Sequence, residues 1–439
     1  MTTASLLSDE RPYPGLRPFG FEDSEFFFGR EKQISALYKL LDLSRFVAVV
    51  GSSGSGKSSL VRAGLLPLLQ REAASPGGRK WRFATLHPGD RPLEALRDAV
   101  LDLASQTDDP DDLPDVEIRR SRVEYTLNNS ASAGLGLAIQ NIRGLRDCSS
   151  FLVVDQFEEL FRYATGEGKR AEAAWRDDAA YFVKLLLEAT RDRSGSVYVL
   201  ITMRSDFIGD CAQFYGLPEA VSATQFLVPS LTRDQREEVI RKPVERAGAR
   251  IDPPLVERLL NDAGRQADQL PVLQHCLARL WEKAPQSGGK PHLTVAEYES
   301  IGGMEHALSR HAEAVRHAPE LAGLDPVIQL VFRSLSERDK EGRATRRALP
   351  LRTLRDETGA DQADLLKILD RFRADDCSFL VPARSERIVL RDETRIDVGH
   401  EALLRGWDAM SGDNGWLAQE EFDARRYRGL LALLEAGMV

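Results

Sequence analysis

The segment RFVAVVGSSGSGKSSL, residues 45–60, constrains the fold more than any other part of the chain. An apolar run at Phe46–Val50 is followed by the spacing Gly-x-x-x-x-Gly-Lys-Ser and then by helix-forming sequence at Ser59–Leu69. A strand that ends in such a loop directs successive backbone N–H groups toward a phosphate chain, at the positive end of a helix. The segment therefore predicts a phosphate-binding loop, and a flexible Gly/Ser-rich loop is the alternative.

The residues of this loop have separate roles in holding a nucleoside phosphate and its metal ion. Gly51 and Gly56 allow the backbone to approach the phosphates closely, and Lys57 reaches the β- and γ-phosphates. The hydroxyl of Ser58 is the kind of ligand that Mg²⁺ takes in such loops. The other predicted nucleotide-binding positions of the loop are Ser52, Ser53, Gly54, Ser55 and Ser59.

Composition places the chain among soluble globular proteins. Of its 439 residues, 42% are hydrophobic and 29% are charged, and no window approaches the apolar length of a membrane span. A chain of this length buries two or three hydrophobic cores. We therefore expect several domains and no membrane partner.

Net charge and cysteine content indicate which partners and which cellular compartment to expect. The net charge of −9 disfavours nonspecific contact with nucleic acid, so we expect nucleic acid not to be a partner. The four cysteines are far apart and form no Cys-x-x-Cys pair, which indicates a reducing compartment with neither disulfides nor a zinc site. The amino terminus lacks the basic and apolar regions of a secretory signal. We expect a cytoplasmic protein.

Strand-like and helix-like patterns alternate in the first half of the chain. Helical patterns such as Pro92–Ala104 and Ala179–Thr190 separate apolar, β-prone runs, and this alternation predicts an α/β fold with a parallel sheet. We expect a nucleotide-binding domain at 11–230, with a polar surface insertion at Gln106–Asn129 that is helical after Val116. The strand-like runs are Phe46–Val50, Trp81–Leu86, Phe151–Val154, Val197–Met203 and Gln225–Val228.

The second half of the chain predicts two further domains. Residues 231–322 carry apolar residues at helical spacing, which predicts an all-α domain with a loop at Gln286–His292. Residues 323–415 follow the helix, helix, hairpin order of a winged helix. A short tail at residues 1–10 precedes these domains, and an amphipathic helix at 416–439 follows them as a docking edge or the start of a missing domain. In the predicted winged helix, the helices are Pro326–Ser336 and Asp361–Arg373, and the β-prone runs are Ser378–Pro382, Arg387–Leu390 and Arg395–Val398.

A second apolar strand, Phe151–Val154, ends in the carboxylate Asp155. In a phosphate-binding-loop NTPase such a strand places its carboxylate beside the loop, where Asp155 would hold Mg²⁺ together with Ser58. Glu158 and Glu159 follow, and either carboxylate would reach the attacking water as general base. We favour Glu159, with Glu158 close behind. The alternative is a core strand followed by acidic residues that only complement a helix dipole.

The strand Val197–Met203 delivers Arg204 to its carboxyl end, where ligands bind in open parallel sheets. An arginine there would contact the γ-phosphate and stabilise charge in the transition state. A salt bridge between Arg204 and Asp206 is the alternative.

Together these segments resemble the STAND class of signalling ATPases, which is related to the NACHT and NB-ARC ATPases, and specifically its bacterial novel-STAND group. The resemblance runs from Arg11 to about Trp416. It implies a P-loop NTPase parallel sheet of the AAA+/STAND kind, followed by a helical domain and a winged-helix domain. The motifs that carry it are YPGLRPF at 13–19, FFGRE at 27–31, VDQFEELF at 154–161, RSDF at 204–207, LPVL at 270–273 and GHEALL at 399–404.

The resemblance adds nucleotide-binding residues outside the loop. It implies that Gly29 and Arg30 lie on the adenine side, that Pro271 packs near the base and that His400 is a sensor histidine. Taken alone, Gly29–Arg30 is a turn before a helix, Pro271 is an ordinary first-turn proline and His400 is more often a capping or core histidine. A histidine that reaches a bound diphosphate from the third domain would tie domain closure to the nucleotide state.

The resemblance implies a nucleotide-dependent switch with ATP or ADP and Mg²⁺ as cofactors. An ADP-bound closed monomer would open on a stimulus, exchange ADP for ATP and self-associate, with slow ATP hydrolysis as the reset. Such switches act in bacterial signalling or antiphage defence. The sequence shows no effector or sensor domain, so we expect either a fragment or an effector or sensor protein that acts in trans.

Two other functions compete with the switch. A small-molecule kinase would need an acceptor pocket, for which the sequence carries no signature. A DNA-binding regulator would use the winged helix, but the predicted recognition helix, Asp361–Asp376, carries more acidic than basic residues and would repel phosphates. Its basic residues are Lys367, Arg371 and Arg373.

Overall fold

The computed structural model describes residues 11–106, 116–162, 169–192, 196–263, 269–287, 290–338, 344–384, 388–412, 415–419, 422 and 426. Contacts within the chain divide it into two units. The first, which we call the sheet unit, is Phe19–Thr232. The second, the helical unit, joins Met1–Pro18 to Arg233–Val439. The chain therefore passes between the units twice, directly after Pro18 and directly after Thr232.

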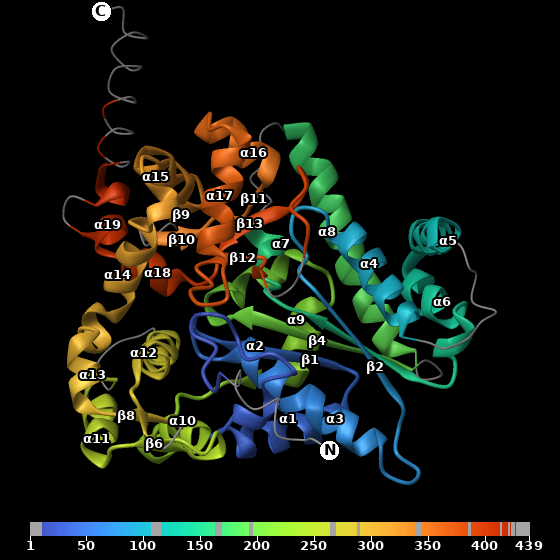
Figure 1. Cartoon of the computed structure of the whole chain (residues 1–439). Helices are drawn as coiled ribbons and strands as arrows, with labels where there is room; N and C mark the ends of the chain where they lie inside the picture. Colours follow the sequence, from blue (N-terminus) through green and yellow to red (C-terminus); the bar gives the residue numbers. More distant parts are fainter. Residues whose placement is uncertain are drawn as a thin grey trace, which may run out of the picture. The chain divides into compact units, whose positions relative to one another are not determined.

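The sheet unit is built on parallel strands, of which β1, β2 and β4 are labelled in Figure 1. The strand order is β2-β3-β4-β1-β5. Each strand-like run predicted from the sequence is confirmed to within a residue or two. Because β4 lies between β1 and β3, the carboxyl ends of these strands meet along one edge of the sheet. The strands are β1 Phe46–Gly51, β2 Trp81–Leu86, β3 Ser149–Val154, β4 Val197–Arg204 and β5 Gln225–Leu227.

Both faces of the sheet are buried, because alternate residues of a strand enter two different cores. Val50 enters one core and its neighbour Val49 enters the other. Strands buried on both faces have continuous apolar sequences, and this property made them recognisable. The first core takes in α4 Pro92–Ser105, α8 Lys169–Arg191 and α9 Leu217–Thr224, and the second takes in α1 Glu31–Leu43 and α3 Leu66–Ala73.

A helical excursion lies between β2 and β3. After α4 it contains α5 (Val116–Asn129) and α6 (Gly134–Gln140). Val123 and Leu127 attach α5 to the first core. The helix predicted after Val116 is therefore confirmed, while residues 107–115 of the predicted insertion lie outside the described residues.

The helix that follows the loop after β1 changes its winding. It starts as α2 (Lys57–Ser59), continues as a π-helical segment at Leu60–Leu65 and ends as α3. Gly64 allows α1 to pack closely there, because a Cβ atom at Gly64 would lie 2.8 Å from Cγ1 of Ile34. Short π-helical segments are frequent at functional sites.

The first part of the helical unit surrounds what we call the helical core, which includes Tyr13, Ile240, Leu259 and Leu277. The amphipathic patterns of the sequence are confirmed as helices that turn their apolar faces toward this core. They are α10 Arg233–Arg246, α11 Pro253–Asp262, α12 Gln269–Lys283, α13 Val295–Ser300 and α14 Gly303–Arg316.

The prediction that this part is all-α is wrong in one respect. A small sheet of β6 (Arg250–Ile251), β8 (Lys290–Leu293) and β7 (Gln286–Ser287) occupies the place of the loop predicted at Gln286–His292. β8 pairs with β6 in parallel and with β7 antiparallel. Strands this short carry too little alternation to be distinguished from a loop in the sequence.

The second part of the helical unit surrounds the C-terminal core, which includes Leu16, Phe332, Phe372 and Trp407. The two helices predicted there are confirmed as α15 and α17. Its elements are α15 Asp325–Ser334, β9 Ser336–Arg338, β10 Ala344–Arg346, β11 Leu349–Pro350, α16 Leu351–Thr358, α17 Gln362–Phe372, β12 Leu380–Val381, β13 Arg395–Val398, α18 Glu401–Gly406 and α19 Asp408–Ser411.

The predicted hairpin pairs differently from expectation. β12 pairs antiparallel with β13, whereas residues 388–390 of the run expected at Arg387–Leu390 form no strand. Ile388 and Val389 are exposed and only Leu390 packs against the C-terminal core, so the run buries little apolar surface. The prediction of a strand there is therefore wrong, and Arg387 lies outside the described residues.

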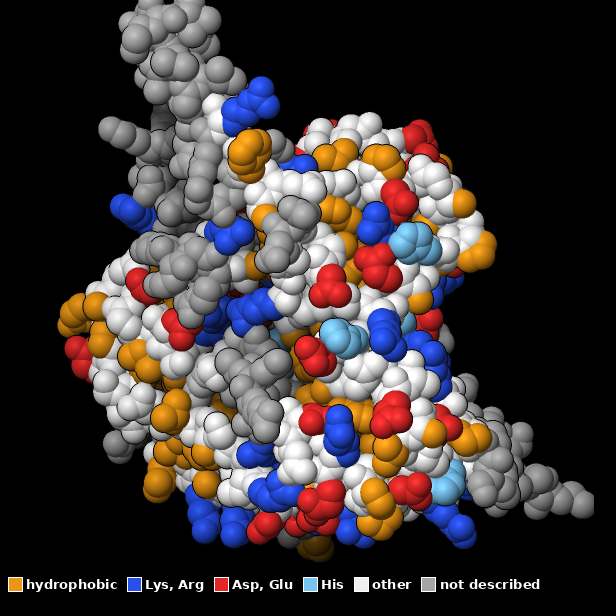
Figure 2. All heavy atoms as spheres, turned by 90° about the vertical axis from the view of Figure 1, so that its left-hand side faces the viewer, with side chains coloured by type: hydrophobic (Ala, Val, Ile, Leu, Met, Phe, Trp, Pro, Cys, Tyr) orange, Lys and Arg blue, Asp and Glu red, His pale blue; other side chains and the backbone are white. Residues whose placement is uncertain are grey.

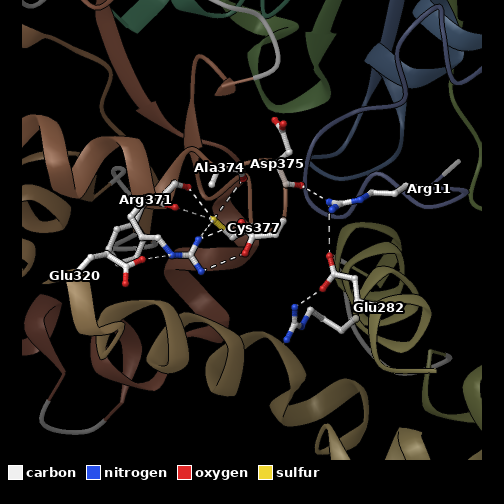
Figure 3. Close-up of polar contacts among 10 residues, drawn as sticks. Arg11, Glu282, Glu320, Arg371, Ala374, Asp375 and Cys377 are labelled. Atoms are coloured by element: carbon white, nitrogen blue, oxygen red, sulfur yellow. Dashed lines mark hydrogen bonds and ion pairs between the residues drawn. The ribbon is translucent and has the colours of Figure 1, made fainter. Parts of the chain in front are cut away.

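The segment Arg11–Pro18 contacts both parts of the helical unit. Tyr13 is buried in the helical core, where its hydroxyl donates to the carbonyl oxygen of Ile240, and Leu16 is buried in the C-terminal core. Arg11 donates to the carbonyl oxygen of Asp375 at 3.0 Å, and its Nη1 lies 3.7 Å from Oε1 of Glu282 (Figure 3). The sequence assigned this segment to the nucleotide-binding domain, but its contacts place it in the other unit.

The carboxyl-terminal tail is described only in part. Of the amphipathic helix predicted at 416–439, the structure describes residues 416–419, 422 and 426. Trp416 and Leu417 are buried against the C-terminal core. Within the part of the chain that the structure describes, no helix is long and apolar enough to cross a membrane.

Candidate nucleotide-binding site

Glycine is required at several positions of the loop between β1 and α2. Gly54 and Gly56 have φ angles of 71° and 88°, in the left-handed region that glycine adopts without strain. A Cβ atom at Gly51 would lie 2.8 Å from Oγ of Ser55. The spacing seen in the sequence therefore reflects a backbone that turns tightly at the end of β1.

The loop holds an ammonium group and a buried hydroxyl close to its backbone. The ammonium group of Lys57 donates to the carbonyl oxygens of Gly51 at 3.0 Å and Ser52 at 2.8 Å. The hydroxyl of Ser55 is buried and has no hydrogen-bond partner within the described ranges. A buried hydroxyl and a cation at the amino end of a helix match the oxygen atoms of a phosphate.

Asp155 and Ser58 come together at the edge of the sheet, as the sequence predicted. Oγ of Ser58 donates to Oδ1 of Asp155 at 2.8 Å, and Oγ1 of Thr202 donates to the same oxygen at 2.5 Å. Asp155 is only 2% exposed. A carboxylate and a hydroxyl in contact fit Mg²⁺, which prefers oxygen ligands, so these are the two residues that would hold it.

Two basic residues face the other oxygen of Asp155. Nη2 of Arg62 donates to Oδ2 at 2.9 Å, and Nε2 of His87 lies 3.8 Å from it. Burial would raise the pKa of Asp155, but Arg62, His87 and the hydrogen bonds from Thr202 and Ser58 outweigh it and lower the pKa to about 2. The carboxylate is therefore ionised throughout the physiological range.

The two candidate bases lie in different surroundings. Glu158 is 6% exposed, and its Oε2 accepts from the backbone N–H of Arg204 at 3.3 Å. Burial raises the pKa of Glu158, and the charges of Lys57 and Arg204 oppose the shift. Glu159, at the start of α7 (Glu159–Arg162), accepts from the backbone N–H of Gly89 at 2.9 Å. Glu158 thus interacts electrostatically with Lys57 of the loop.

Arg204 lies at the carboxyl end of β4, as predicted, and it is engaged there. Its Nη2 donates to Oδ2 of Asp206 at 2.6 Å, and its guanidinium carbon lies 5.8 Å from the centre of the Phe207 ring. The Arg204 side chain is 11% exposed and the Asp206 side chain is 43% exposed, so the pair is shielded from water only on the arginine side. The alternative foreseen in the sequence, a salt bridge with Asp206, is therefore present.

Arg30 connects the loop to the end of the sheet unit. Its guanidinium donates to the carbonyl oxygen of Pro229 at 2.7 Å and to that of Ser55 at 3.0 Å. Burial lowers the pKa of Arg30 to about 10, which leaves it charged at neutral pH. Gly29, with a φ angle of 79°, precedes it and donates its N–H to Glu31 at the start of α1. Arg30 thus links the loop after β1 to the segment that follows β5.

Pro271 and His400 belong to the helical unit. Pro271 lies in the first turn of α12, and His400 precedes α18, where its Nδ1 accepts the N–H of Ala402 at 3.0 Å. His400 therefore caps a helix, as one reading of the sequence foresaw. An Nδ1 that accepts leaves Nε2 to carry the ring proton.

Sequence reasoning missed Thr202, Arg62 and His87 as parts of the site. Arg62 could have been predicted from the sequence, because a residue four positions after Ser58 on a helix lies on the same face. Thr202 is a buried polar residue within the apolar strand β4, which is itself an indication of a partner. His87 follows β2 directly, but nothing in the sequence gives the strand order that brings it near Asp155.

Comparison with known proteins identifies a family. The family model described as novel STAND NTPase 1 matches residues 12–435 of this chain. No curated protein matches this chain.

Solved structures resemble the chain at low identity. ORC1 of Aeropyrum pernix, solved in complex with DNA, is 15% identical over 92% of this chain and 96% of its own, with a TM-score of 0.44. A Walker-type ATPase of Pyrococcus abyssi is 15% identical over 91% of this chain and 98% of its own, with a TM-score of 0.36. ORC2 of Aeropyrum pernix is 15% identical over 78% of this chain and 79% of its own, with a TM-score of 0.42. At these scores the resemblances carry no argument about this chain.

Proposed function

Since the chain belongs to the novel STAND NTPase 1 family, we propose that it is an ATP- and ADP-binding switch whose two units respond to the bound nucleotide. The observation that carries the proposal is the contact between Ser58 and Asp155, which brings the phosphate-binding loop and the carboxylate strand into one site. In this proposal Lys57 and the loop N–H groups bind the phosphates, and Ser58 and Asp155 hold Mg²⁺. The metal, when bound, would neutralise phosphate charge.

We propose Glu158, not Glu159, as the base of a slow hydrolysis. Glu158 would accept a proton from the water that attacks the γ-phosphorus, while the bond to the bridging oxygen breaks and ADP leaves. Its burial and its raised pKa suit a proton acceptor, and the charges of Lys57 and Arg204 act on it. Glu159 is held by the N–H of Gly89 and would act only on the position of that loop.

Arg204 suits a regulated role in this reaction. Its ion pair with Asp206 must open before the guanidinium can reach a phosphate. The cost of breaking this charge-assisted hydrogen bond would slow turnover until a conformational change releases the guanidinium. Slow hydrolysis is what a resetting step needs.

In this proposal, the bound nucleotide acts on the helical unit through the contact between Phe19 and Ser59. The N–H of Phe19 donates to Oγ of Ser59 at 3.1 Å, and Ser59 follows the metal ligand Ser58. Residue 18, directly before Phe19, belongs to the segment that fastens to both cores of the helical unit. A change at Ser58 and Ser59 therefore acts on the start of that segment.

The remaining parts of the proposal follow from the resemblance. His400 and Pro271 would contact the nucleotide from the helical unit, whose second part we interpret as a winged helix. The ATP state would self-associate, and an effector or sensor protein would act in trans, in bacterial signalling or antiphage defence. The cytoplasm is the location that we propose for this activity.

The arginines at the end of α17 are engaged within the protein, which disfavours binding of DNA through this helix. Arg371 forms ion pairs with Glu320 and Asp376 (Figure 3), and Arg373 is buried and donates to the carbonyl oxygens of Pro382 and Ile388. Neither is directed at a phosphate backbone. On the face drawn in Figure 2, basic and acidic side chains are interspersed. We therefore keep the prediction that nucleic acid is not the partner.

The proposal is tested by measuring mass and shape in solution with ADP and with a nonhydrolysable ATP analogue. We expect the wild type to change between the two nucleotides and Lys57→Ala to lose the response together with binding. His400→Ala would bind nucleotide but lose the response, and His400→Asn, which can still cap α18, separates loss of the imidazole from loss of the cap. If neither mass nor shape responds to nucleotide, the switch is refuted. Turnover that depends on an added acceptor would indicate a kinase instead.

A further inference from the structure

Arg62 occupies a position for which the phosphate-binding motif supplies no role. It lies in the π-helical segment Leu60–Leu65, whose other five members are all buried. Its Nη2 donates to Oδ2 of Asp155 at 2.9 Å, with the two side chains 27% and 2% exposed. Its Nε is buried without a hydrogen-bond partner among the described residues. Among the described residues, the hydrogen-bond partner of this side chain is therefore the carboxylate of Asp155.

The contacts of Asp155 are divided between its two oxygens. Ser58 and Thr202 donate to Oδ1, Arg62 donates to Oδ2, and Nε2 of His87 lies 3.8 Å from Oδ2. A buried carboxylate without a positive partner is costly, and Arg62 is the permanently charged group that supplies that positive charge when no metal ion is bound. Two positive charges on one carboxylate repel each other, and a guanidinium on Oδ2 therefore opposes the binding of Mg²⁺ to the same group.

We propose that Arg62 is a positioning residue that acts as an internal counter-cation for Asp155, so that the site binds ADP with little need of Mg²⁺. With Arg62 paired to Asp155, the negative carboxylate does not repel the phosphates of the nucleotide, even when metal is absent. Magnesium has to compete with the guanidinium for Asp155. The dependence of nucleotide affinity on Mg²⁺ is therefore set by a residue outside the phosphate-binding motif. The inference rests on the proposed nucleotide binding.

The test is the affinity for ADP, measured by calorimetry in EDTA and in Mg²⁺. In the wild type the two dissociation constants should lie close together. Arg62→Met keeps the length of the side chain but removes its charge, so ADP should bind about ten-fold more weakly in EDTA and recover in Mg²⁺. Arg62→Lys, which keeps the charge, should restore most of the metal-independent affinity.

Two controls separate this role from others. Arg71→Met removes an exposed arginine of α3, whose Nε donates to the carbonyl oxygen of Pro67, and it should leave both affinities unchanged. In an Asp155→Asn background, Arg62→Met should have no effect in EDTA, because no carboxylate charge remains to be neutralised.

Each outcome bears on the proposal. Equal weakening in EDTA and in Mg²⁺ would make Arg62 a phosphate ligand and overturn it, as would an Arg62→Met variant with wild-type affinity in EDTA. A wild type that binds ADP in neither condition would refute the proposed function itself. A wild type that binds ADP only with Mg²⁺ would refute the counter-cation role and leave nucleotide binding standing.

Discussion

Oγ of Ser58 lies 2.8 Å from Oδ1 of Asp155, although 97 positions separate the two residues in the chain. The contact exists because β4 lies between β1 and β3 and aligns their carboxyl ends. It joins a phosphate-binding loop to a buried carboxylate, and the chemistry proposed for this chain depends on that junction.

Lys57→Ala should abolish tight nucleotide binding. Lys57 is the cation of the loop, and a charge-assisted contact with phosphate is worth roughly 2–3 kcal/mol, so affinity should fall about 30- to 150-fold. Calorimetric titration with ADP measures the affinity of both proteins. A variant with wild-type affinity would show that the loop binds no phosphate.

Glu158→Gln should stop hydrolysis without weakening ATP binding. Loss of a general base lowers the rate by about 10²- to 10⁴-fold, whereas the amide keeps the shape of the side chain. Glu159→Gln is the matched control and should retain most of the rate. Single-turnover measurement of phosphate release distinguishes them, and the reverse ranking would assign the base to Glu159.

Leu16→Ala should loosen the helical unit. Leu16 is buried in the C-terminal core, and a buried Leu→Ala change lowers the free energy of unfolding by about 2–5 kcal/mol. Leu43→Ala alters a leucine that is 85% exposed, so it should change the free energy of unfolding little. Urea denaturation measures both variants. Equal stabilities would show that the segment Arg11–Pro18 is not fastened in solution.

The helical unit should lose stability as the pH falls below about 6.5, the ordinary pKa of histidine. His275 and His311 are buried with ring centres 5.1 Å apart. Burial lowers the pKa of His275 to about 3, with a further contribution from Arg279, and burial, His275 and Arg279 lower that of His311. Both rings are neutral when folded, so protonation favours the unfolded chain.

The size of this effect is up to about 2 kcal/mol for each histidine between pH 7 and pH 5. His311→Phe should reduce the loss, because phenylalanine fits beside the Phe379 ring and cannot be protonated. Urea denaturation at pH 7 and pH 5 measures the difference. His317→Gln alters an exposed histidine and serves as control, and equal pH dependence in His311→Phe and wild type would contradict the account.

The strands and the loop were predictable because their signals are local. Val47 to Val50 are buried on both faces and appear as an uninterrupted apolar run, and the spacing from Gly51 to Ser58 follows from the course of one backbone turn. The carboxylate of Asp155 was predictable for the same reason, since it ends a similar run.

The residues that the sequence did not reveal depend on contacts between distant segments. His87 and Thr202 approach Asp155 only because β2, β3 and β4 are neighbours, and strand order leaves no mark on any one of them. The sequence predicted the segment Arg11–Pro18 as part of the nucleotide-binding domain, whereas its contacts group it with the helical unit. Its apolar residues, Tyr13 and Leu16, do not indicate in the sequence which core receives them. The proposed preference for Glu158 over Glu159 likewise rests on contacts that the sequence does not give.

The most direct test of the switch is to identify the nucleotide that copurifies with the protein. Denaturation of the purified chain followed by ion-exchange chromatography of the supernatant measures it. The account predicts ADP in near-stoichiometric amount in the wild type and none in Lys57→Ala. An empty wild-type site would indicate an enzyme that releases its product, and ADP retained equally by Lys57→Ala would show that the nucleotide is bound elsewhere.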